Sequence, residues 1–281
     1  MRNFFCGWYF KCQNHRQTVA FIPAYHIRDN VKSCSLQVIT HRGAWNVEYP
    51  FEEFRVDKNA VKIGGNLFSG QGCRLDVRAD NLTVQGELRF GELAPIAYDI
   101  MGPFKYVPFM ECRHIVYSMK HWVEGCLSVN GEEFVFENAL GYLEGDRGRS
   151  FPKAYLWTQC CFAEGSLMLS VADIPFCGIH FNGIIGVILY RGKEYRLATY
   201  LGARAVKIRD GEAVIRQGSR TLTVRCIEKN AHPLAAPVKG EMGRRILESA
   251  SCSCFYRFAE NGKKVFEFVS DMASFEYEYP Q

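Results

Sequence analysis

Apolar and polar residues alternate along most of this chain with a period of two, the pattern of half-buried β-strands. The segment 73–78, CRLDVR, and the segment 221–227, TLTVRCI, each place every second side chain on one face. Many runs end at a turn pair such as Asn130-Gly131 or Asn261-Gly262. These pairs favour two-residue hairpins, because both central residues need positive φ. The pattern predicts an all-β protein and leaves room for one short helix near 240–249.

The chain also repeats itself in a collinear series of short matches. The run AVKI at 60–63 recurs at 205–208, and QGCR at 71–74 has a counterpart in QGSR at 217–220. Later in each half, Glu111 matches Glu248 and Glu144 matches Glu276. A single match could arise by chance, but an ordered series indicates internal duplication. We therefore expect two tandem β units, residues 1–148 and 149–281, each a barrel or strongly curved sheet of about eight to ten strands.

Composition narrows the function classes. The net charge of +4 comes from 34 basic and 30 acidic residues, too even a balance to favour nucleic acid as a partner. The chain has no run of 18 apolar residues, so we expect no membrane span, whereas peripheral contact with a membrane stays open. The first residues lack a secretory signal, which predicts a cytoplasmic protein whose twelve cysteines are mostly reduced. Nothing in the sequence determines the oligomeric state.

The sequence gives little reason to expect a metal or a cofactor. Cys252 and Cys254 share one face of a strand, but no matching pair of Cys or His stands near them in the sequence. We interpret them as small core residues rather than zinc ligands. Loops that cradle phosphate and Ser-His-Asp arrangements are also missing, which argues against nucleotide enzymes and hydrolases.

One long segment resembles a known family. The run GYLEGDRGRSFP at 141–152, followed by Tyr155, Trp157 and Gln159, resembles the central motif of the tocopherol cyclase-like family. The runs GWYFK at 7–11 and PFMECRH at 108–114 resemble other segments of its bacterial members. The resemblance implies a double lipocalin-like fold and action on a lipophilic prenylated or polyene molecule. The plant cyclases carry Trp-Gly where this chain has Arg147-Gly148, a departure that concerns the substrate and not the fold.

Cyclisation, hydration or isomerisation of such a molecule needs a carboxylic acid kept protonated by burial and an aromatic, water-poor pocket. In a strand, Tyr142, Glu144 and Asp146 point to one face. The expected catalytic residues are Glu144 and Asp146, either of which could be the proton donor. Glu144, between Leu143 and Gly145, is the better candidate donor, whereas Asp146 stands beside arginines and is the better candidate for an ion pair with Arg147 or Arg149. We expect the pocket where the two halves meet, with substrate-binding residues Tyr142, Trp157, Gln159, Glu111 and His114.

Less specific interpretations remain beside this one. The symmetry of Glu144 with Glu276 favours a structural role, Trp157 is a normal core aromatic, and Glu111 with Arg113 explains itself as an ion pair. The chain could thus be an enzyme, a lipocalin-like carrier of a hydrophobic ligand, or an interaction module.

Overall fold

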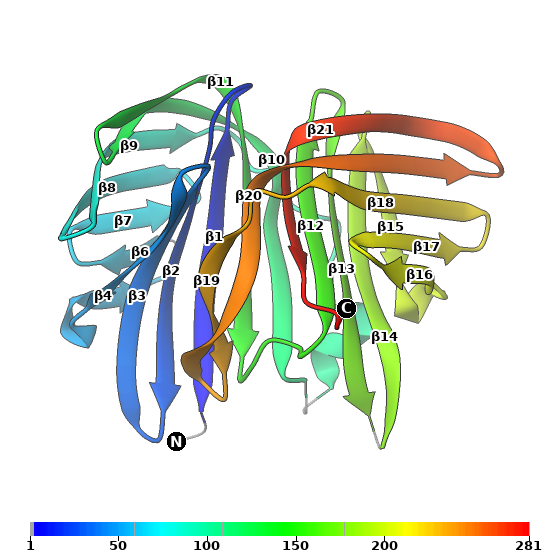
Figure 1. Cartoon of the computed structure of the whole chain (residues 1–281), viewed down its shortest axis with the longest axis horizontal. Helices are drawn as coiled ribbons and strands as arrows, with labels where there is room; N and C mark the ends of the chain where they lie inside the picture. Colours follow the sequence, from blue (N-terminus) through cyan, green and yellow to red (C-terminus); the bar gives the residue numbers. More distant parts are fainter. Residues whose placement is uncertain (1–2, 59, 108–109, 177, 281) are drawn as a thin grey trace. The chain divides into compact units, whose positions relative to one another are not determined.

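The computed structural model describes residues 3–58, 60–107, 110–176 and 178–280. Pro108 and Phe109 of the run that resembles the family, and Cys177, lie outside the described residues. About three quarters of the described chain is β-strand, in two antiparallel sheets, so the predicted fold class is confirmed (Figure 1). Helical structure is limited to the 3₁₀ turns η1 (Phe51–Glu53), η2 (Gly102–Tyr106) and η3 (Thr199–Leu201). Within the described residues, none of these turns has the length and apolar character needed to cross a membrane.

The first sheet has eleven strands. In spatial order they are β4 (Gly43–Tyr49), β3 (Val31–Thr40), β2 (Thr18–Arg28), β1 (Phe4–Gln13), β11 (Glu132–Gly148), β10 (Cys112–Val129), β9 (Leu82–Phe90), β8 (Gly72–Ala79), β7 (Asn66–Ser69), β6 (Ala60–Ile63) and β5 (Phe54–Val56).

The second sheet has ten strands. Its path runs through β15 (Lys193–Ala198), β14 (Ile179–Tyr190), β13 (Gly165–Phe176), β12 (Tyr155–Phe162), β21 (Lys263–Tyr277), β20 (Glu241–Glu260), β18 (Arg220–Glu228), β17 (Glu212–Gln217) and β16 (Arg204–Arg209), while β19 (His232–Val238) pairs with β20 off this path.

The strand orders of the two sheets agree around their centres. In each sheet four consecutive strands are joined by hairpins, β1 to β4 in one and β12 to β15 in the other. The first strand of each four, β1 or β12, also pairs with the strand of its sheet that comes last in the sequence, β11 or β21. Two of the sequence matches are displaced by one hairpin strand. Counted outward from β10 and β20, β16 is equivalent to β7, whereas AVKI at 60–63 is β6, and QGCR at 71–74 lies at the turn after β7 whereas QGSR at 217–220 lies at the turn after β17. Short alternating runs look alike in every strand, so such a match can slip by one hairpin strand.

Two other local predictions have clear outcomes. The Asn130-Gly131, Asp210-Gly211 and Asn261-Gly262 pairs all have positive φ at both residues, between 51° and 82°, and each connects two antiparallel strands. The predicted helix near 240–249 is wrong, because Glu241–Glu260 is one long strand. Alternate residues of this strand are buried from Ile246 onward, and tertiary burial of that period outweighs local helix propensity.

Contacts within the chain define two compact units, unit 1 and unit 2. Unit 1 comprises residues 1–95, 111–151 and 234–245, and unit 2 comprises 96–110, 152–233 and 246–281. Most of each half thus forms one unit, and two short segments join the other. Residue Ala235 is held in unit 1 by the Gln37 side chain, which bonds to its N–H at 2.9 Å and to its carbonyl at 3.1 Å. In unit 2, Arg196 bonds to the carbonyl of Asp99 at 3.2 Å.

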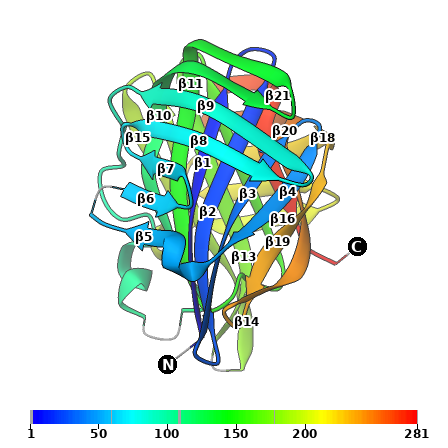
Figure 2. The ribbon, with the colours of Figure 1, turned by 90° about the vertical axis from the view of Figure 1, so that its left-hand side faces the viewer.

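The sheet of unit 1 curves back over itself. Figure 2 shows β5 to β9 crossing β1 to β4 at a steep angle. The long strands β10 and β11 connect the two arms, and register shifts along them mark the bulges that let strands bend. Apolar side chains of both arms meet inside, including Phe10, Phe21, Phe68, Phe134 and Phe136, none more than 3% exposed. Each such fully buried side chain contributes about 1.5–3 kcal/mol of hydrophobic stabilisation.

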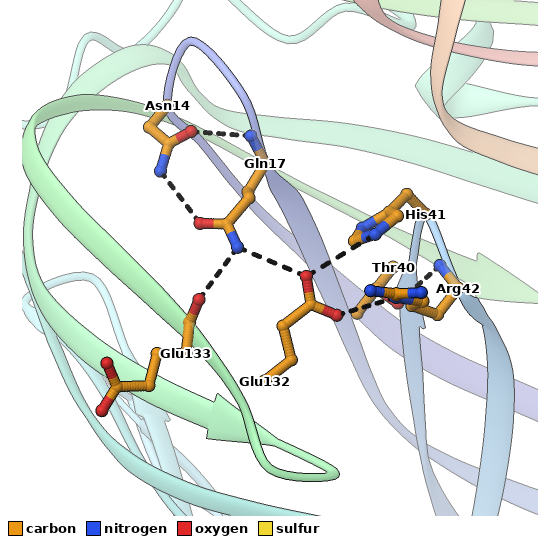
Figure 3. Close-up of polar contacts among 7 residues, drawn as sticks. All are labelled: Asn14, Gln17, Thr40, His41, Arg42, Glu132 and Glu133. Atoms are coloured by element: carbon orange, nitrogen blue, oxygen red, sulfur yellow. Dashed lines mark hydrogen bonds and ion pairs between the residues drawn. The ribbon is translucent and has the colours of Figure 1, made fainter.

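Polar side chains hold three turns of unit 1 together (Figure 3). The Glu132 carboxylate at the start of β11 contacts Arg42 Nε at 3.0 Å, His41 Nε2 at 3.6 Å and Gln17 Nε2 at 3.5 Å. Its slight burial raises the pKa of Glu132, but the hydrogen bond from Arg42 and the neighbouring His41 outweigh this and lower it. The Asn14 side chain closes the β1–β2 turn by accepting the Gln17 N–H at 2.7 Å. These contacts fix the hairpin ends.

Candidate acid–base site

A bulge in β11 decides which side chains of this strand face away from the core. Phe134 and Phe136 point into the apolar cluster, but Asn138 has φ of 49° and the register slips by one residue there. Beyond it, Ala139 and Leu143 face the core. The alternate residues Tyr142, Glu144 and Asp146 therefore lie on the opposite face. That face is not solvated: Tyr142 is 1% exposed and Glu144 4%.

Two of these polar side chains contact a histidine of β10, and the third contacts one of the two. His114 is paired with Asp146 across the two strands, and its Nδ1 lies 3.0 Å from Asp146 Oδ1. The other ring nitrogen, Nε2, lies 3.0 Å from Glu144 Oε2 in an ion-pair contact that lacks the alignment of a full hydrogen bond. The Tyr142 hydroxyl donates to the same Glu144 oxygen at 2.6 Å. The result is one chain from Tyr142 through Glu144 and His114 to Asp146, buried except at Asp146, whose side chain is 22% exposed.

Electrostatics assigns the proton of this chain. Burial lowers the pKa of His114, but Glu144 and Asp146 on its two sides outweigh that effect, and the pKa is raised well above 6.5. His114 is thus an imidazolium at neutral pH. Next to it, the Cys112 thiol donates to Asp146 Oδ1 at 3.3 Å. Burial and then the Asp146 charge raise the pKa of Cys112 well above 9.0, so this thiol stays protonated.

Two of these residues have other partners or roles than the sequence predicted. Asp146 was expected to pair with Arg147 or Arg149, and its partner in the structure is His114. His114 was expected as a substrate-binding residue, and the structure makes it the centre of the cluster. The central place of His114 follows from the β10–β11 pairing, in which His114 and Val116 oppose Asp146 and Glu144. Pairing the two alternating runs antiparallel in the sequence could have placed His114 beside these carboxylates.

Two residues of β1 belong to the same face and were missed. Tyr9 is paired with Glu144, and Lys11 is paired with Tyr142. Their Cβ atoms thus stand about 5 Å from those of their partners. Lys11 is 1% exposed, a rare state for a lysine. The sequence did carry a signal, since Lys11 is a charged residue within the run of apolar, aromatic and glycine residues from Phe4 to Cys12.

The remaining predicted residues lie elsewhere. Glu111 is exposed, and what it supplies in the structure is its backbone carbonyl, which accepts the Arg149 N–H at 2.7 Å. Trp157 and Gln159 belong to β12 in unit 2, where both are buried. There they face away from the core that contains Leu156 and Cys160. Their sharing a pocket with Glu144 stays a prediction.

Unit 2 has its own phenol–carboxyl pair at the equivalent position. Glu276 of β21 is paired with Trp157, as Glu144 is paired with Tyr9 in unit 1. The Tyr155 hydroxyl donates to Glu276 Oε2 at 2.5 Å. Across β20 and β21, Glu276 opposes Glu248, whereas Glu144 opposes Val116. The match of Glu144 with Glu276 therefore agrees with the strand register, and the match of Glu111 with Glu248 does not.

The unit 1 cluster has the donor types of a metal site, since single ligand atoms of His114, Glu144 and Asp146 lie within 4.8 Å of one another. The two ring nitrogens of His114, however, contact different carboxylates on opposite sides of the ring. Metal ligands must converge on one point, and a histidine can offer only one nitrogen to it. The arrangement fits proton sharing better than metal binding.

Solved structures share this fold across nearly the whole chain. An AttH-like protein from Nitrosomonas europaea matches with a TM-score of 0.58 and 10% identity over 100% of this chain and 93% of its own. Kievitone hydratase from Nectria haematococca matches with a TM-score of 0.53 and 13% identity, covering 99% of this chain and 89% of its own. The structure of CghA with Sch210972 matches with a TM-score of 0.59 and 10% identity, covering 99% of this chain and 89% of its own.

The similarity is therefore one of fold: these neighbours share the duplicated lipocalin-like β architecture. No family model matches the sequence, and no curated protein matches it.

Proposed function

We propose that this protein is an enzyme of the tocopherol cyclase-like group. It would act without a cofactor on a lipophilic prenylated or polyene molecule, by proton-driven cyclisation, hydration or isomerisation. The observation that carries the proposal is the chain Tyr142–Glu144–His114–Asp146, in which the proton shared by the buried Glu144 and His114 is held away from bulk water. Apolar side chains would serve a purely structural core as well, because the free-energy cost of desolvating two charges can exceed their mutual attraction even when they are paired.

The chain can deliver its proton through Glu144. Moving the proton from His114 Nε2 to Glu144 Oε2 across 3.0 Å converts an ion pair into two neutral groups. In a desolvated site this transfer separates no charge, so the protonated acid is accessible when a substrate alkene or carbonyl approaches. Asp146, on the far side of the ring, holds the orientation of His114 and stabilises the imidazolium that must form again. Tyr142 fixes the position of the carboxyl oxygen.

The neighbours support the class of reaction. One is a hydratase by name, and another was solved with Sch210972. Unit 1 also offers apolar surroundings, since Val116 of β10 and Tyr9 of β1 flank Glu144 in register and are both buried. In a polar, water-filled pocket, water would compete with the substrate for the proton of the Glu144 carboxyl group.

The test begins by identifying the small molecule that the protein binds. Lipophilic compounds that co-purify with the full chain are extracted, identified by mass spectrometry, and returned to the stripped protein in D₂O. An enzyme that moves protons should exchange deuterium into the compound or convert it to a product. Glu144→Gln keeps the shape and still accepts the Tyr142 hydrogen bond but cannot carry the proton, so incorporation should fall at least about 100-fold.

The matched control is Glu48→Gln, the same change at an exposed site of unit 1 that lies outside the predicted site. It should leave deuterium incorporation unchanged. Binding without exchange or conversion in the parent chain would refute the enzyme and support a lipocalin-like carrier. Equal activity of the parent and the folded Glu144→Gln variant would refute the proton path.

A further inference from the structure

A cluster of three sulfur atoms lies in unit 2, outside the acid–base site. Cys226 of β18 is directly paired with Cys254 of β20, and Cys252 stands two positions before Cys254 on the same strand. The Sγ atoms of the three residues all lie within 4.8 Å of one another, and those of Cys252 and Cys254 are 3.5 Å apart. Cys226 was the partner that sequence spacing could not reveal, because it lies on another strand.

The backbone brings these side chains together for an identifiable reason. The pairing of β20 with β21 shifts register between Ser249 and Cys252 and again between Cys252 and Cys254. The pairing of β18 with β20 shifts just after Cys226. Bulges of this kind re-aim side chains and occur often at functional sites. Here they direct three thiols of two strands toward one point.

The surroundings of the cluster differ from one side to the other. Cys254 is fully buried and Cys252 is 4% exposed, and both belong to the apolar core of unit 2. Cys226 is only partly buried, so the cluster is closed on the core side and reachable from the Cys226 side. An ion could enter there and exchange its water for sulfur.

The geometry suits coordination by three thiolates. A metal–sulfur distance of about 2.3 Å places the corners of a trigonal sulfur triangle about 4 Å apart. The observed separations, 3.5 Å for one pair and at most 4.8 Å for the others, reach this value by side-chain rotations of under about 1 Å.

We propose that Cys226, Cys252 and Cys254 bind one Cu⁺ ion. Soft thiolate ligands select Cu⁺, Zn²⁺ and iron–sulfur clusters. A structural zinc site takes four protein ligands, and among the described residues the cluster offers three Cys, His, Asp or Glu ligands. Three-coordinate sulfur binding is what Cu⁺ accepts. Binding as three thiolates releases the three thiol protons to solvent.

The experiment uses the full, reduced chain under anaerobic conditions. Cu⁺ is supplied from a coloured chelator, and the copper transferred to the protein is followed by loss of the chelator complex. One ion should be retained per chain, and X-ray absorption should show three sulfur neighbours. Cys226→Ser, at the partly buried position, should weaken retention at least about tenfold, as should Cys254→Ser if that core variant folds by circular dichroism.

Two further cysteines give matched controls. Cys126→Ser changes an exposed cysteine, and Cys161→Ser changes a buried one in unit 2 that lies outside the cluster. Both variants should retain Cu⁺ as the parent does. The proposal is overturned if the parent holds no more copper than Cys226→Ser, if the controls lose it equally, or if Zn²⁺ displaces the bound Cu⁺ at equal concentration.

Discussion

His114 should make the stability of unit 1 depend on pH in a defined direction. Its two carboxylate neighbours raise its pKa in the folded chain well above 6.5, whereas in the unfolded chain it returns to about 6.5. The folded state then keeps a proton that the unfolded state has already lost. The resulting stabilisation is complete below about pH 6.5 and disappears as the pH rises through the folded pKa.

The magnitude follows from linkage. Each proton held by the folded state and not by the unfolded state changes the free energy of unfolding by about 1.4 kcal/mol per pH unit. Between pH 7 and pH 9 the parent chain should therefore lose stability more steeply than His114→Gln, by up to this slope. The Cys112 thiol also adds to the slope as the pH approaches 9, because it begins to ionise in the unfolded chain while burial keeps its pKa raised in the folded chain, but this contribution is common to the parent and His114→Gln and cancels in their difference.

The measurement is guanidinium unfolding at several pH values, followed by tryptophan fluorescence. Three of the four tryptophans, Trp8, Trp45 and Trp122, lie in unit 1, so the signal reports mainly on that unit. The quantity to plot is the parent's free energy of unfolding minus that of His114→Gln. This difference should shrink as the pH rises.

The control replaces another buried histidine of β10. Burial lowers the pKa of His121 to about 4, so it is neutral in the folded state throughout this range. The difference between the parent and His121→Gln should stay flat above about pH 7.5. If the His114→Gln difference is equally flat, His114 is not a buried imidazolium, and the proton path proposed for Glu144 loses its source.

Much of the fold could be predicted from the sequence because its determinants are local. The two-residue alternation and the Asn-Gly pairs act within a few residues, and both give the same strands and turns in the structure. The helix expected near 240–249 failed because burial against the rest of unit 2 decided the conformation of that segment. The match of AVKI at 60–63 with AVKI at 205–208 failed for a similar reason: which strand a short run forms depends on pairing partners far away in the sequence.

The candidate site shows the same division. The shared face of Tyr142, Glu144 and Asp146 follows from periodicity alone, and they do lie together. Periodicity does not identify the group between the two carboxylates. That group, His114, lies 30 residues before Glu144 (144 minus 114) and is placed there by the pairing of β10 with β11. Cys226 joined Cys252 and Cys254 by the same route. Cross-strand register is set by bulges and turns, which short motifs in one strand cannot reveal.

Two further predictions test the redox state and the packing beneath the site. Thiol titration of denatured, unreduced protein should find nearly all twelve cysteines free, and four or more disulfides would contradict the expected reducing compartment. Gly141→Ala should destabilise unit 1 by about 1–3 kcal/mol, because its new Cβ would stand 2.2 Å from Nε2 of His121. The His121 ring has little room to move: it is buried against Phe90, with ring centroids 4.7 Å apart, and its Nδ1 lies 3.0 Å from Ser118 Oγ. Gly43→Ala, whose Cβ would meet its nearest atom at 3.4 Å, is the control. Equal melting temperatures for the two variants would show that β10 and β11 are less tightly packed at His121 than the structure requires.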